Sequence, residues 1–191
     1  MEIKVMHQIM EWNEDVSDQV KATLADHKIC MINVMGSPGA GKTSMIVALI
    51  AALRETCPDV VGWVTIPDTK IDYPIVHGED NDFYLTHLPD KTKNAAGSIM
   101  MDVANAGEFT DDVSILHGHH MKSGAMFGDL DLYKKEAYYK EHPVMRLHTP
   151  QGDYDVAIFA AYSVDGSKFA YKTNFGSEEE FKAFYQYAIT R

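Results

Sequence analysis

Cysteine is scarce in this sequence: its 191 residues include two, Cys30 and Cys57. Two cysteines are too few for a disulfide framework, and Cys30 lies in an apolar run, where it is expected to be a small buried residue. No cysteine follows position 57. The residues after Cys57 therefore include no thiol for nucleophilic catalysis.

Basic residues and long apolar runs are also few. The 17 Lys and Arg residues against 28 Asp and Glu residues give a net charge of −11, which argues against a nucleic-acid backbone or an anionic membrane surface as a partner. The longest apolar run, Met45 to Leu53, is too short to span a bilayer, and Glu2, Lys4 and Glu11 do not fit a signal peptide. The expectation is a chain without a membrane anchor or an export signal, which favours the cytoplasm.

The composition that remains, 46% hydrophobic and 24% charged residues, is that of a soluble globular protein with room for one domain or a domain and a fragment. The residue pattern changes near Leu53 and Arg54, so two segments are predicted, residues 1–53 and 54–191.

The first segment has the pattern helix, strand, loop, helix. Apolar residues recur at helical spacing from Ile3 to Asp26, and Ile29 to Val34 is an apolar run typical of a buried strand. A full GxxxxGK[ST] phosphate-loop motif follows, and Met45 to Leu53 is predicted to be a helix. The motif consists of Gly36, Ser37, Pro38, Gly39, Ala40, Gly41, Lys42 and Thr43.

Each part of this motif has a chemical reason. Glycines let backbone N–H groups surround phosphate oxygens, and a helix N-terminus adds partial positive charge. Lys42 would reach the β- and γ-phosphates, and Thr43 would bind Mg²⁺. The alternative interpretation is a glycine-rich turn between a strand and a helix.

The stretches MHQIMEWNEDV and CMINVMGSPGAGKTS resemble the start of the hydrogenase-maturation nickel-incorporation GTPases (HypB-type), over about residues 1–53. The resemblance implies GTP and Mg²⁺ binding, GTP hydrolysis and delivery of nickel or zinc. The chain departs from it, because a second Mg²⁺-side carboxylate, a guanine-reading motif and the metal-binding Cys-His motif are missing; Asn94, for example, is followed by Ala95. Nucleotide binding without catalysis is expected.

The second segment contains short apolar runs of the kind that form strands, separated by turn residues, which suggests a β-barrel or a sandwich. The last two runs are predicted to pair as a hairpin around Pro150 to Asp153. Glu178 to Ile189 is predicted to be an amphipathic helix with Ser177 as its N-cap. The predicted strands are Val60–Ile66, Asp72–Val76, Ser98–Met101, Val113–Leu116, Val144–Thr149 and Asp153–Val164.

The stretch Val113 to Leu130, VSILHGHHMKSGAMFGDL, combines an apolar strand with His117, His119 and His120, followed by a loop and a helix expected to start near Met126. An imidazole at the end of a buried strand suits proton transfer near neutral pH. Two alternatives are open: the histidines cap a strand in a polar loop, or they bind a metal together with His142 or His148.

Residues from about 55 to 184 resemble a class B sortase, in order and with matching spacing. The resemblance implies a sortase β-barrel with peripheral helices and a cofactor-free thiol transpeptidase that acts outside the membrane. It would cut a sorting-signal peptide and join the acyl group to a cell-wall or pilin amine. His119 matches the family's catalytic histidine, His120 a loop neighbour, and His117 a strand position that is often aromatic. The matching stretches are PDVVGWVTIP, TKIDYPIV, DNDFYL, AGSIMMD, LHGHHM and MFGDL.

The chain departs from this family at its C-terminal end. The family's nucleophilic cysteine and its arginine lie on late strands after the histidine, whereas here Cys57 precedes the first barrel strand. Arg146 lies in another strand context, and Arg191 is the last residue. The sequence therefore predicts an α+β chain with an incomplete sortase-type barrel. The barrel is expected to contain His119 but to be catalytically inactive.

Overall fold

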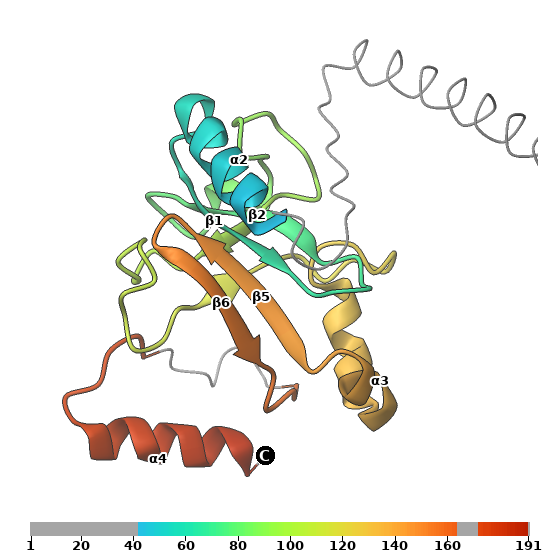
Figure 1. Ribbon diagram of the computed structural model, residues 1–191, viewed down its shortest axis with the longest axis vertical. Coiled ribbons are helices and arrows are strands. Elements are labelled where there is room, and N and C mark those ends of the chain that lie inside the picture. The colour runs from blue at the N-terminus through green and yellow to red at the C-terminus, as the bar shows by residue number, and fades with distance from the viewer. Residues whose placement is uncertain (1–41, 164–171, 191) are drawn as a thin grey trace, which may run out of the picture. The chain divides into compact units, whose positions relative to one another are not determined.

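The computed structural model describes residues 42–163 and 172–190 of the chain (Figure 1). One compact unit runs from Thr43 to Arg191. Its helices and strands are α2 (Lys42–Thr56), β1 (Val60–Thr65), β2 (Asp72–His77), the 3₁₀ helix η1 (Phe83–Leu85), β3 (Ile99–Met101), β4 (Leu116–His117), the 3₁₀ helix η2 (Gly128–Lys134), α3 (Glu136–Glu141), β5 (Val144–Thr149), β6 (Gly152–Ala157) and α4 (Glu178–Ile189).

Most of the predicted N-terminal segment lies outside the described residues: the helix 3–26, the strand 29–34 and the phosphate-loop residues 36–41. The backbones of Lys42 and Thr43 form the start of α2. The helix predicted from Met45 to Leu53 is confirmed, and it continues to Thr56, across the boundary expected at Leu53 and Arg54.

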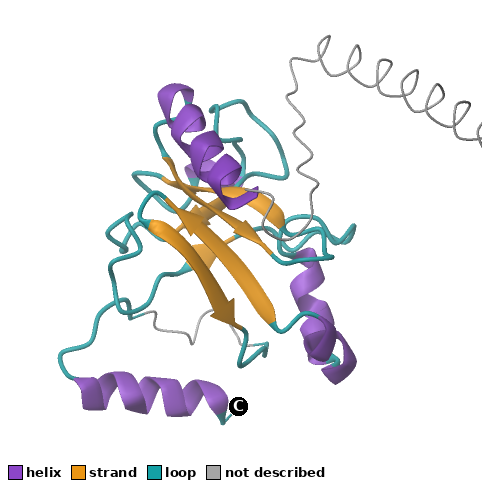
Figure 2. Ribbon diagram, viewed as in Figure 1, coloured by secondary structure: helices purple, strands orange, loops and turns teal. Residues whose placement is uncertain are grey.

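The strands form one mixed sheet in the order β4-β3-β2-β1-β5-β6. Strands β2 and β3 are parallel, and the other neighbours are antiparallel. Figure 2 shows the strands together in one layer, with α2, α3 and α4 outside it. Among the described strands, β4 and β6 each have a neighbour on one side only, so the sheet is open between them.

Apolar side chains cover both faces of the sheet. One cluster includes Val64, Ile75, Ile99 and Met101, and the other includes Ile50, Val60, Val76, Tyr84 and Met100. Neighbouring residues of β2 and β3 alternate between the clusters, as a pleated strand requires.

A β-bulge in β1 explains why Val60 and Val64 belong to different clusters. Residues four apart on a regular strand share a face. The register of β1 against β2 shifts between Val60 and Gly62, and the extra residue turns Val60 to the opposite face. Ile50 of α2 packs there, so the helix covers that side of the sheet.

The strand predicted over Val113–Leu116 is wrong in its bounds. The ladder covers Leu116 and His117. Ile115 O still accepts from Asp102 N at 2.9 Å, but the amide of Ile115 and both backbone groups of Val113 bond to other partners. The Asn105 side chain donates to Val113 O at 2.8 Å and accepts from Ile115 N at 2.9 Å, and Val113 N donates to Thr173 O at 2.9 Å. The Asn105 side chain has therefore taken two of the hydrogen bonds that a longer ladder would need.

Two other boundaries also differ from the prediction. Strand β6 ends at Ala157, well before Val164, and the next amide, Ile158 N, donates to Pro143 O at 2.9 Å. The helix expected from Met126 starts at Gly128 and is a 3₁₀ helix, because Met126 has a left-handed backbone, with φ 55°.

The hairpin and the C-terminal helix are confirmed. Strands β5 and β6 pair from Val144↔Ala157 to Thr149↔Gly152, which leaves Pro150 and Gln151 as the turn. Helix α4 has the predicted bounds, and the Ser177 side chain accepts from Glu180 N. Among the helices described here, none is long and apolar enough to cross a bilayer.

Candidate functional site

His119 lies just beyond β4, two residues after the end of an antiparallel pairing with β3. Its half-buried imidazole is bonded through Nε2 to the carbonyl oxygen of Leu85, at 2.6 Å. Its own carbonyl oxygen accepts from Phe127 N at 3.0 Å. Ring and backbone are therefore both anchored. With Nε2–H donating to Leu85, Nδ1 is the nitrogen left for a reacting group.

Gly118 lets β4 approach its neighbours closely. A Cβ at this position would contact Ile99 Cδ1 and lie 2.8 Å from Phe127 Cδ2, closer than real Cβ atoms come. Any other side chain here would push the residue before His119 away from the sheet.

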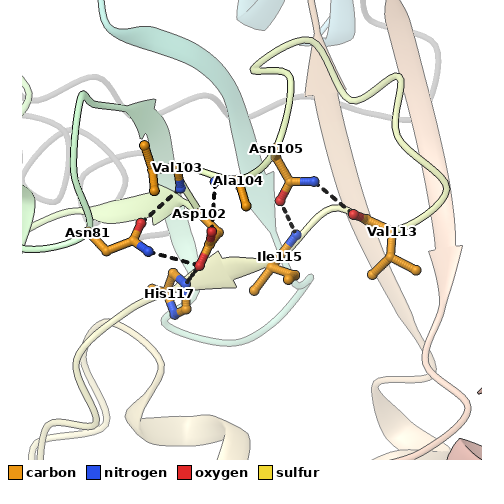
Figure 3. A network of polar contacts seen from close by, with 8 residues as sticks. All are labelled: Asn81, Asp102, Val103, Ala104, Asn105, Val113, Ile115 and His117. Carbon is orange, nitrogen blue, oxygen red and sulfur yellow. Dashed lines mark hydrogen bonds and ion pairs between the residues drawn. The ribbon is translucent and has the colours of Figure 1, made fainter. Parts of the chain in front are cut away.

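A buried carboxylate lies beside His117 (Figure 3). Asp102 is 7% exposed and follows β3 directly. Its Oδ2 accepts from His117 Nε2 at 2.7 Å and from Asn81 Nδ2 at 3.0 Å, and its Oδ1 accepts from Ala104 N at 2.8 Å. Burial raises the pKa of Asp102, but the hydrogen bonds from Ala104, His117 and Asn81, with the His117 charge, outweigh it and hold the pKa below its ordinary value.

The other histidines do not gather around His119. His120 is exposed and pairs with Asp131 at 2.7 Å. His142 Nδ1 is bonded to Pro67 O at 3.0 Å, and His148 Nδ1 to Asp153 at 2.7 Å. In residues 42–163 and 172–190 no group of three or more His, Cys, Asp or Glu side chains could hold a metal ion. The metal interpretation of the histidines therefore has no support in this part of the chain.

An open cavity of about 370 Å³ lies on the side of His120. The cavity has apolar walls, from Ile66, Tyr133, Met145 and Ile158, and polar ones, from His120, Asp131 and Lys134. The cavity is large enough for one or two residues of a peptide, because small-molecule sites begin at about 300 Å³.

The remaining candidates from the sequence lie elsewhere. Cys57 is 6% exposed and packs with Ile50 and Val60 in the cluster under α2. Arg146 lies on β5, is exposed, and has Nε 3.6 Å from Asp155 Oδ1. Neither has a described contact with His119. Asp102 and Asn81 were not predicted to be site residues. The signal that could have identified Asp102 was a carboxylate directly after a buried run, next to the predicted histidine strand.

No family model matches the sequence. Among curated proteins, sortase B of Listeria monocytogenes is 40% identical over 134 residues, which cover 70% of this chain and 54% of that protein. The chain thus spans about half the length of this relative.

Sortase B proteins are also found among the solved structures that this chain resembles. Sortase B from Listeria monocytogenes matches with a TM-score of 0.67 and 38% identity, over 74% of this chain and 81% of that chain. Sortase B from Bacillus anthracis, in complex with AAEK1, matches with a TM-score of 0.68 and 34% identity, over 73% of this chain and 65% of that chain. The sheet is thus the curled half-barrel of a sortase-type fold.

Proposed function

This chain belongs to the sortase B family, and from that membership we propose that its sheet carries the proton-donating half of a cysteine transpeptidase site. The observation that carries the proposal is the anchored imidazole of His119, whose Nε2 is 2.6 Å from Leu85 O. In the proposed reaction Nδ1 of His119 takes the proton of a cysteine thiol, and the thiolate attacks the scissile carbonyl of a sorting-signal peptide. The imidazolium then gives that proton to the amine that leaves as the C–N bond breaks. An arginine steadies the oxyanion, and a cell-wall or pilin amine takes the acyl group.

The cavity beside His120 supports a peptide as the substrate. Its apolar walls would hold a side chain of the sorting signal. No cofactor takes part, because the thiol, the imidazole and the guanidinium supply the chemistry.

We also propose that a polypeptide of these 191 residues does not complete this reaction. Its two cysteines are Cys30 and Cys57, and the buried thiol of Cys57 has Thr56 Oγ1 as its described polar neighbour, at 3.8 Å. An imidazole without a thiolate is a poor nucleophile toward an amide.

Two measurements on the 191-residue chain test these proposals. Adding sorting-signal peptides should shift the side-chain resonances of His119 in an NMR titration, and the absence of any shift at saturating peptide would overturn the proposed site. Fluorogenic versions of the same peptides should be cleaved no faster by the chain than by its His119→Ala variant. Turnover that His119→Ala abolishes would contradict the proposed lack of catalysis.

A second function rests on the phosphate-loop motif, Gly36 to Thr43, alone. We propose that a polypeptide of this sequence binds GTP with Mg²⁺ there without hydrolysing it. Equilibrium titration with GTP should show binding that Lys42→Ala weakens at least tenfold. Binding that is absent, or that does not depend on Lys42, would exclude this function.

A further inference from the structure

Two separate segments hold the His119 imidazole in place, and one buried side chain is bonded to both of them. His119 follows β4 through Gly118, and the acceptor of its ring proton, Leu85 O, lies at the end of η1. The strand and the 3₁₀ helix are far apart in sequence, so their spacing must be set by a tertiary contact.

The backbone bond from Ser98 N to Tyr84 O, at 2.8 Å, is one such contact, and the carboxylate of Asp102 supplies another. Its Oδ2 holds His117, the last residue of β4, at 2.7 Å. The same oxygen accepts from Asn81, in the loop before η1, at 3.0 Å. Asn81 Oδ1 in turn accepts from Val103 N at 2.8 Å, so the loop is fastened to the end of β3 through both atoms of its amide.

We propose that Asp102 and Asn81, with His117, are positioning residues for His119. They fix the distance between β4, which leads to His119, and the loop that leads to η1, whose last residue carries the acceptor. In this way they keep the ring proton on Nε2 and leave Nδ1 for the reacting group. The inference rests on the proposed function, since Nδ1 must be unprotonated to take the proton of the thiol before the imidazolium passes it to the leaving amine.

The charge of Asp102 is essential to this arrangement. Three donors, from His117, Asn81 and Ala104, converge on its two oxygens. An asparagine has one oxygen and one NH₂ group, so at least one donor would face another donor in a buried site. Asp102→Asn therefore separates the strand from the loop while the residue's volume is kept.

The test is an NMR measurement on the full chain with ¹⁵N-labelled histidine, in which long-range ¹H–¹⁵N spectra report which ring nitrogen carries the proton. His119, assigned through His119→Gln, should show the Nε2–H form in the parent chain. In Asp102→Asn the two ring-nitrogen shifts should converge, as the fixed tautomer is lost. Asn81→Ala changes a residue that has no described hydrogen bond to β4, and it should have the same effect on the His119 tautomer. If Asp102→Asn does not fold, the result with Asn81→Ala tests the inference.

The matched control is Asp153→Asn, which changes the carboxylate partner of a different histidine, the buried His148, at the same distance of 2.7 Å. It should lower stability without changing the His119 spectrum. The inference would be overturned if folded Asp102→Asn or Asn81→Ala kept the fixed tautomer of His119. It would also be overturned if Asp153→Asn lost that tautomer to the same extent. No peptide is used, so this failure is distinguishable from failure of the proposed function.

Discussion

Tyr84 and Asp59 form a hydrogen bond beneath α2 that links η1 to the start of β1. The Tyr84 hydroxyl donates to Asp59 Oδ2 at 2.6 Å, and the tyrosine is 1% exposed. This bond, with the nearby Lys91, holds the pKa of Asp59 below its ordinary value. Burial and the neighbouring Asp59 carboxylate raise the pKa of the Tyr84 hydroxyl. The pair should therefore stabilise the fold in a limited range of pH.

The sign of each effect follows from linkage. A carboxyl with a lowered pKa in the folded state contributes stability above its unfolded pKa of about 3.9, and this is lost as the pH falls through the folded pKa. A tyrosine with a raised pKa contributes stability below its unfolded pKa of about 10, and this is lost as the pH rises through the folded value.

Tyr84→Phe should lower the free energy of unfolding by about 1–3 kcal/mol at pH 7, because a hydrogen bond to a charged group is removed. The difference between parent and variant should narrow below about pH 4 and above about pH 10. Urea unfolding across this pH range measures it. The exposed Tyr139→Phe is the control and should show little difference; a Tyr84→Phe effect that is constant with pH would contradict the argument.

At the scale of single elements, α4 has a capping arrangement that was visible in the sequence. Ser177 Oγ accepts from Glu180 N at 3.3 Å, and Glu180 Oε2 accepts from Gly176 N at 3.1 Å. The first turn also carries three acidic residues, which favour a helix N-terminus. Such local signals do not depend on the rest of the fold, and the predicted bounds of α4 were right for that reason.

Ser177→Ala should reduce the local stability of α4 by about 1 kcal/mol, because the Glu180 amide loses its acceptor. Hydrogen exchange of the α4 amides should accelerate about fivefold, while amides of β1 and β2 keep their rates. Ser177→Asp retains an acceptor oxygen and should keep the parent rates. Unchanged exchange in Ser177→Ala would show that the tertiary contacts of α4, such as Phe159 with Tyr185, dominate its stability.

Strand β4 shows the opposite case. The residues before and within β4 have the apolar pattern of a longer strand. The side-chain amide of Asn105, ten residues before Ile115, instead bonds to Val113 O and Ile115 N, which a longer ladder would have used. Nothing in the local sequence distinguishes these two partners. The strand could be predicted, and its length could not.

At the scale of the whole molecule, α2 belongs to the folding unit of the sheet. Ile50 is 1% exposed and packs with Val60, Val76 and Met100 from three strands, and Trp63 packs against the same cluster. The boundary predicted at Leu53 and Arg54 marks where the resemblance to one family ends and the resemblance to another begins. In the structure this boundary falls inside α2, a helix that packs into the core.

Ile50→Ala should lower the free energy of unfolding by about 2–4 kcal/mol, through lost burial and the cavity left behind. The change should appear in the cooperative unfolding transition that Trp63 fluorescence reports, measured in a Trp12→Phe background. The matched control is Ile189→Ala at the end of α4, where the side chain is 41% exposed and the loss should be small. An unchanged Trp63 transition in Ile50→Ala would mean that α2 unfolds separately from the sheet.

The sequence alone determined the family, the strand that leads to His119, the β5–β6 hairpin and the capped helix α4. These depend on periodicity, turn residues and motifs, which are local along the chain. The tertiary structure alone decided that His117 and Asn81 converge on Asp102, that Asn105 takes hydrogen bonds next to β4, and that α2 covers the sheet. Those contacts join residues whose proximity depends on strand register and on a β-bulge, and neither of these is written in any single stretch of the chain.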